Sequence, residues 1–84
     1  MTPDSLELFL LLWNDAPNWG GIPMWDGNVL DTPERKGNLT HLKKLGLVFT
    51  QVSEGDVWVY FTDLGVEFAR HLPGASEYGG PQWA

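Results

Sequence analysis

The chain contains no cysteine and few basic residues. Without cysteine it has no disulfide, no thiolate metal ligand and no cysteine nucleophile, which fits an intracellular protein. Only 5 of its 84 residues are Lys or Arg, against 11 Asp or Glu, so the net charge is −6. Such an acidic chain, taken as a whole, has little nonspecific affinity for nucleic acid or anionic lipid.

Long apolar runs are absent as well. The longest, residues 8–13, is far shorter than the roughly 20 residues that a bilayer span needs. The first residues also lack the basic stretch of a secretion signal. We therefore expect a soluble, cytoplasmic protein with no membrane partner. A length of 84 residues with 43% hydrophobic residues fits one small domain with a single core.

Groups for catalysis and metal binding are also scarce. The only histidines are His41 and His71, and neither has Asp, Glu or Ser at a spacing typical of a catalytic triad or a metal site. Gly20-Gly21 lacks the strand, Lys and hydroxyl context of a phosphate-binding loop. We expect no enzyme activity, no metal site and no cofactor.

Thr2-Pro3-Asp4 is a strong helix-opening signal and predicts a helix over residues 3–14. Its apolar residues form two neighbouring stripes, so the helix should be covered on two sides. Either it is the central core helix, or the second stripe is a homodimer interface within residues 6–13. The first stripe is Leu6, Phe9, Leu10 and Trp13, and the second is Leu8, Leu11 and Leu12.

Residues 15–31 have no helical periodicity and contain Pro and Gly. Asp26-Gly27 favours a tight turn between short paired strands at residues 24–25 and 29–30. Trp19 and Trp25 are the large side chains of this segment. They either pack the loop onto the core or form an exposed patch that binds a partner.

Positive charge is concentrated in residues 32–48. Four of the five basic residues lie there with a single acid, so the segment has a charge of +3 (four cations less one acid) and the remainder −9. Thr32-Pro33-Glu34 repeats the opening signal seen at Thr2, and two helical interpretations fit. One is a helix over residues 33–45 that tolerates Gly37 at a cost of about 1 kcal/mol. The other, which we favour, is a turn ending at Lys36 and a helix over residues 39–45 capped by Asn38.

In this basic helix Leu39, Leu42 and Leu45 mark the buried face, and Gly46 ends the helix. Two strands, residues 47–52 and 57–61, follow and form a hairpin through a turn at residues 53–56. Alternation places Trp58 and Tyr60 opposite the core face formed by Val57, Val59 and Phe61. These two aromatics are either covered by another segment or form a contact surface.

Thr62-Asp63 caps a last helix that reaches about residue 72, with Leu64, Phe68 and Leu72 on its buried face. Pro73-Gly74 ends it. Residues 74–84 are predicted to be a flexible tail, in which Tyr78 and Trp83 dock back on the domain or on a partner.

The string GNLTHLKKLGLV at residues 37–48, Gly55 at the hairpin tip and VYFTDLG at residues 59–65 resemble bacterial winged-helix regulators over about residues 32–72. Small winged-helix proteins encoded by bacteriophages are similar in length and in the basic segment. The resemblance implies an α+β winged helix-turn-helix domain over residues 1–73, with a small antiparallel sheet and a C-terminal helix.

The resemblance also implies a function, namely transcription regulation by binding double-stranded DNA through residues 38–45. The lysines and arginine would neutralise phosphates, and Asn or Thr would reach base edges. The implied DNA-binding residues are Arg35, Lys36, Asn38, Thr40, His41, Lys43 and Lys44.

An alternative follows from the acidic body and from Glu54 and Asp56 at the hairpin tip, where two carboxylates repel phosphates. The same winged-helix fold would then serve as a protein-interaction module, such as a phage-encoded modulator of a host protein. Aromatic side chains are favoured anchors in protein interfaces. The candidate anchors are Trp19, Trp25, Trp58 and Tyr60.

Overall fold

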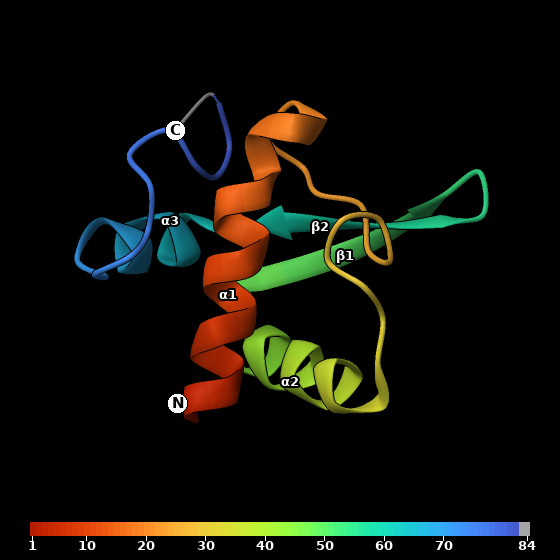
Figure 1. The fold of residues 1–84 in the computed structure, drawn as a ribbon, viewed down its shortest axis with the longest axis horizontal. Helices are drawn as coiled ribbons and strands as arrows, with labels where there is room; N and C mark the ends of the chain where they lie inside the picture. The colour runs from red at the N-terminus through yellow and green to blue at the C-terminus, as the bar shows by residue number, and fades with distance from the viewer. Residues whose placement is uncertain (83–84) are drawn as a thin grey trace.

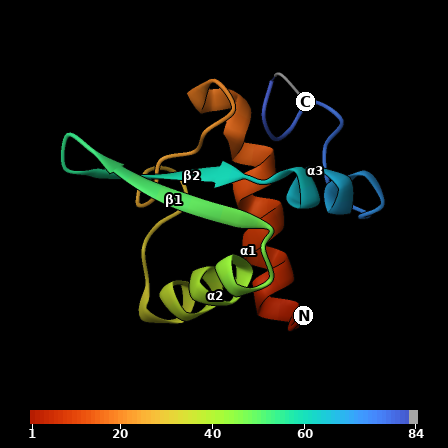
Figure 2. The same ribbon diagram turned by 180° about the vertical axis from the view of Figure 1, so that it is seen from behind.

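The computed structural model describes residues 1–82, which form an α+β fold around one central helix (Figure 1). Helix α1 lies in the middle, with α2, the β-hairpin and α3 arranged about it (Figures 1 and 2). No helix in this described part is long and apolar enough to span a membrane. The elements are α1 (Pro3–Asp15), the 3₁₀ helix η1 (Ala16–Trp19), α2 (Pro33–Lys44), β1 (Val48–Ser53), β2 (Asp56–Phe61) and α3 (Asp63–Arg70).

Helix α1 begins as predicted, since Thr2 Oγ1 accepts a hydrogen bond from the Ser5 amide at 3.1 Å. Its buried face takes residues from both predicted stripes, while Leu11 is exposed. The helix is thus a core helix. A homodimer interface within residues 6–13 stays a prediction, for which Leu11 offers an exposed apolar side chain. The buried residues of α1 are Ser5, Leu8, Phe9, Leu12, Trp13 and Asp15.

The loop from η1 to α2 differs from its predicted hairpin. Met24 pairs with Trp58 of β2, and Trp25 forms only a single bridge to Val29. The Trp25 amide donates to the Val57 carbonyl at 2.8 Å, and the Val59 amide donates to the Pro23 carbonyl at 2.9 Å. A two-residue strand gains more by joining the edge of β2 than by pairing with an equally short segment. Residues 23–25 thereby act as a minimal third strand.

Helix α2 is a single helix, so the favoured division at Gly37 is wrong. Thr32 Oγ1 accepts a hydrogen bond from the Arg35 amide at 3.1 Å, and Pro33 occupies the first turn. This cap starts the helix well before Asn38, which therefore does not cap it. Gly37 is exposed inside the helix. Leu45 is also exposed, contrary to prediction, because it lies at the C-cap, beyond the last helical turn.

The predicted hairpin is confirmed, with β1 and β2 antiparallel and Val48 opposite Phe61. Glu54 and Gly55 form its two-residue turn, and both have positive φ angles, 53° and 84°. Such turns match the twist of the flanking strands. Val59 and Phe61 face the core, as predicted. The hairpin tip extends away from the helices (Figure 1).

Thr62 joins α3 to the start of the hairpin. Its Oγ1 accepts a hydrogen bond from the Gly65 amide and donates one to the Gly46 carbonyl, while its amide donates to the Leu47 carbonyl at 3.1 Å. The cap is as predicted, but Leu64 is exposed rather than buried. The first turn of α3 lies so close to Leu47 that Gly65, not Leu64, faces it.

The segment after α3 is packed rather than free. The Trp13 indole Nε1 donates to the Ser76 carbonyl at 2.9 Å, and the Gly80 amide donates to the Trp13 carbonyl at 2.8 Å. Gly80 and Pro81 are buried. Tyr78, in contrast, is 77% exposed and does not dock on the domain. The corresponding prediction for Trp83 lies outside the described residues.

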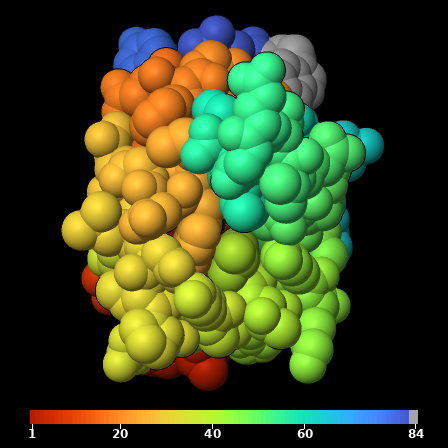
Figure 3. All heavy atoms as spheres, turned by 90° about the vertical axis from the view of Figure 1, so that its right-hand side faces the viewer, coloured from red at the N-terminus to blue at the C-terminus, as the bar shows by residue number. Residues whose placement is uncertain are grey.

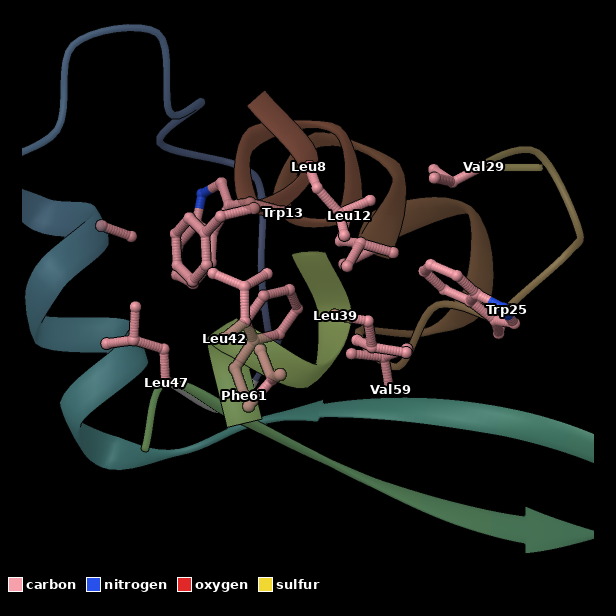
Figure 4. Packing of buried hydrophobic residues seen from close by; sticks show 14 residues of the cluster. Leu8, Leu12, Trp13, Trp25, Val29, Leu39, Leu42, Leu47, Val59 and Phe61 are labelled. Carbon is pink, nitrogen blue, oxygen red and sulfur yellow. The ribbon is translucent and has the colours of Figure 1, made fainter. Parts of the chain in front are cut away.

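All these elements meet in one core (Figure 4). Phe9 of α1 contacts Phe61 edge to face, with ring centroids 5.6 Å apart, and Phe68 of α3 at 5.3 Å. Leu39 and Leu42 enter from α2. Trp25 is also part of this core and is only 8% exposed. Its loop-packing interpretation is therefore confirmed, and it is not available as a partner anchor.

Candidate functional site

The exposed side of α2 carries a row of lysines. Lys36, Thr40, Lys43 and Lys44 follow the i, i+4, i+7, i+8 spacing that places side chains on one helix face, and all four are exposed. Lys36 Nζ lies 3.3 Å from Asp31 Oδ2, but its side chain remains 67% exposed. Within residues 1–82, no acid forms an ion pair with Lys43 or Lys44. We call these four residues the lysine face.

Arg35 does not belong to the lysine face. Its Nη1 donates a hydrogen bond to the Leu30 carbonyl at 2.9 Å, and the residue is half-buried. This contact fixes the loop that enters α2. One of the predicted DNA-binding cations therefore has a local structural role.

Asn38 and His41 also point elsewhere than predicted, toward α1. The Ser5 hydroxyl donates to Asn38 Oδ1 at 3.2 Å and lies 2.9 Å from His41 Nδ1. Thr2 Oγ1 donates to the same hydroxyl at 2.8 Å. Because Ser5 is completely buried, this Ser–His pair joins two helices and presents no nucleophile to solvent. The one sequence signal is Ser5 itself, a small polar residue one helical turn before Leu8 and Phe9.

A second feature lies on the outer face of the hairpin, beside η1. Trp19 and Trp58 pack edge to face with ring centroids 5.9 Å apart. A groove of about 310 Å³ lies between the hairpin and the segment that contains η1. We call it the hairpin groove. It is lined by Trp19, Ile22, Ser53, Glu54, Asp56, Trp58 and Tyr60.

The wall of the groove formed by Trp19 is held by a buried carboxylate that the sequence did not reveal. Asp15, 8% exposed, accepts a hydrogen bond from Trp19 Nε1 at 2.8 Å. It also accepts from Asn18 Nδ2 at 2.9 Å and from Asn28 Nδ2 at 2.8 Å. Asn18 and Trp19 follow Asp15 by three and four residues and Asn28 by thirteen, and all three lie outside the apolar pattern that predicted α1, so only the structure shows this network.

Among residues 1–82, no three His, Asp or Glu side chains gather in a way that could hold a metal ion. The sequence matches no protein-family model, no curated protein and no solved structure. What the lysine face and the hairpin groove can bind therefore follows from their own chemistry.

Proposed function

We propose that this chain is a small winged-helix transcription regulator that contacts double-stranded DNA through the lysine face of α2. The observation that carries the proposal is the gathering of three exposed lysines on one face of one helix, in a chain whose net charge is −6. Lysines placed in this way neutralise phosphates and release counterions. Gly37, one turn from Thr40, is exposed and has open space beside it, so it adds no steric obstacle to a ligand at α2.

The order of elements supports the winged-helix part of the proposal. A helix, a strand segment at residues 23–25 that pairs with β2, a helix, a hairpin and a final helix follow each other in that order. A helix-turn-helix would place a further helix directly before α2. In the described chain, residues 20–32 contain no such helix.

The contacts of the seven predicted DNA-binding residues limit the ways in which the protein can contact DNA. Asn38 and His41 are engaged by Ser5, so few side chains remain to read base edges. Phosphate contacts position a protein on DNA but carry little sequence information. Glu54 and Asp56 at the hairpin tip repel phosphates. Binding should therefore be dominated by charge, with α2 toward the duplex and the hairpin tip away from it.

The proposal is tested by measuring duplex DNA binding by fluorescence anisotropy at several salt concentrations. Lys43→Ala and Lys44→Ala should each reduce the slope of log K against log salt by about one unit, because each removes one phosphate contact. Arg70→Ala is the matched control, since it removes the same charge from α3 and should leave the slope unchanged. Absence of DNA binding at low salt, or equal effects of all three substitutions, would refute the proposal.

A further inference from the structure

The outer face of β2 presents a carboxylate and two aromatic rings in a row. Asp56, Trp58 and Tyr60 alternate along the strand, so their side chains leave the same face of the sheet. Trp58 and Tyr60 are only half-buried. Across the strands, Tyr60 stacks on Phe49 with ring centroids 4.9 Å apart and planes 9° apart. This stack fixes the phenol ring, which lines the hairpin groove.

The side of the hairpin groove that is formed by Trp19 is fixed as well. Trp19 is held by its hydrogen bond to the buried Asp15 carboxylate, which is in turn fixed by two asparagine side chains. Figure 3 shows the orange segment that carries η1 directly beside the green-to-cyan hairpin. A ligand therefore meets indole surfaces that are already oriented, which lowers the entropy cost of binding.

The charge at the groove is negative and uncompensated. Glu54 and Asp56 are exposed at its rim, and no cation in the described part of the chain forms an ion pair with either of them. Aromatic faces attract cations, and the carboxylates act in the same direction. The groove is thus complementary to a positively charged, flat group.

We propose that the hairpin groove binds an arginine side chain presented by a partner protein. A guanidinium stacks on aromatic rings and donates hydrogen bonds to a carboxylate in a two-pronged geometry, which a lysine ammonium does not match. A nucleic acid is disfavoured by the two carboxylates. An apolar anchor would desolvate them without compensation. A volume of about 310 Å³ suits one side chain rather than a helix. This inference does not depend on DNA binding by α2.

The test is an NMR titration of the ¹⁵N-labelled protein with the peptide acetyl-Gly-Arg-Gly-amide. The indole N–H signals of Trp58 and Trp19 should shift, whereas that of the buried Trp25 should not. The same peptide with citrulline, which keeps the shape but lacks the charge, should bind more weakly. Glu54→Gln/Asp56→Asn should weaken binding of the arginine peptide about threefold to tenfold. The control Glu7→Gln/Glu77→Gln removes two charges elsewhere and should have little effect.

Several results would overturn the assignment. If the citrulline peptide shifted the signals as much as the arginine peptide, the groove would not recognise charge. If a lysine peptide bound with the same affinity, the groove would not recognise the guanidinium group. Unchanged affinity of the Glu54→Gln/Asp56→Asn variant for the arginine peptide would show that the two carboxylates do not contribute to binding. Shifts of the same signals on raising the protein concentration without peptide would identify a second copy as the occupant. Loss of duplex DNA binding in the lysine variants has no bearing on these outcomes.

Discussion

Gly37 and Gly65 both lie inside helices, but an added methyl group meets opposite surroundings at the two positions. At Gly37 no atom lies within 4 Å of an ideal Cβ. Gly37→Ala should therefore raise the free energy of unfolding by about 0.5–1 kcal/mol, because alanine loses less backbone entropy in a helix. Chemical denaturation monitored by circular dichroism measures the change. A loss of stability would mean that residues 33–44 do not form one continuous helix.

At Gly65 an ideal Cβ would lie 2.1 Å from the Leu47 carbonyl oxygen. Gly65→Ala should lower the free energy of unfolding by about 2 kcal/mol or more, since backbone rather than a flexible side chain must move. The same denaturation experiment applies, with Gly37→Ala as the partner measurement. Equal effects of the two substitutions would contradict the close approach of α3 to Leu47.

At the residue scale, sequence patterns identified the threonine caps correctly, although Asn38 is not the cap that it was predicted to be, and they identified polar contacts poorly. Thr2, Thr32 and Thr62 all cap helices through their hydroxyl groups, because capping depends on neighbouring residues alone. Ser5 and Asp15 are buried polar residues whose partners lie on other elements. Apolar periodicity contains no information about such partners. The prediction that Asn38 and His41 bind DNA therefore missed their contact with Ser5 of α1.

Helices α1 and α2 are joined by a buried polar contact at the first turn of α1. Ser5→Ala removes the hydroxyl that bonds Asn38 and lies against His41. It should lower the free energy of unfolding by about 1–2 kcal/mol, because Thr2, Asn38 and His41 each lose a partner. The salt dependence of DNA binding should not change, in contrast to Lys43→Ala. The control is Ser53→Ala, which makes the same substitution at an exposed serine and should leave the free energy of unfolding nearly unchanged.

At the element scale, the helices and the hairpin were predictable, and the loops between them were not. The alternation of Val57, Val59 and Phe61 correctly gave the core face of β2. The predicted division of α2 at Gly37 is wrong because the Thr32-Pro33 signal, like Thr2-Pro3 in α1, starts the helix, and one exposed glycine inside a helix costs only about 1 kcal/mol. The pairing of residues 23–25 with β2 joins segments far apart in sequence, so no local turn signal could indicate it.

On the scale of the whole molecule, residues 74–82 complete the cover of α1. The Asn14 side chain donates to the Gly74 carbonyl at 3.1 Å and accepts from the Ser76 amide at 2.9 Å. Deleting residues 74–84 should lower the free energy of unfolding by about 2–4 kcal/mol, since Trp13 loses both packing and its hydrogen bond. Thermal denaturation of the full-length and truncated chains measures this loss of stability. Tyr78→Ala, in the same segment but exposed, should have little effect. A truncated chain of unchanged stability would mean that the segment does not pack on α1 in solution.

The flexible tail was predicted because Gly, Pro and polar residues dominate that segment. In the structure these small residues allow the backbone to lie directly on Trp13. An ideal Cβ at Gly80 would lie 2.3 Å from the indole ring. Composition alone does not distinguish a mobile segment from one whose glycines permit close contact with an aromatic ring.

The contact between Trp13 and Ser76 spans 63 residues. At about 5–20 residues per second on the ribosome, the two partners are made roughly 3 to 13 seconds apart. During that time the apolar surface of α1 around Trp13 lacks its final cover. Nascent α1 should therefore expose apolar surface to chaperones or to other chains, and folding should reach completion only once residue 80 has left the ribosome.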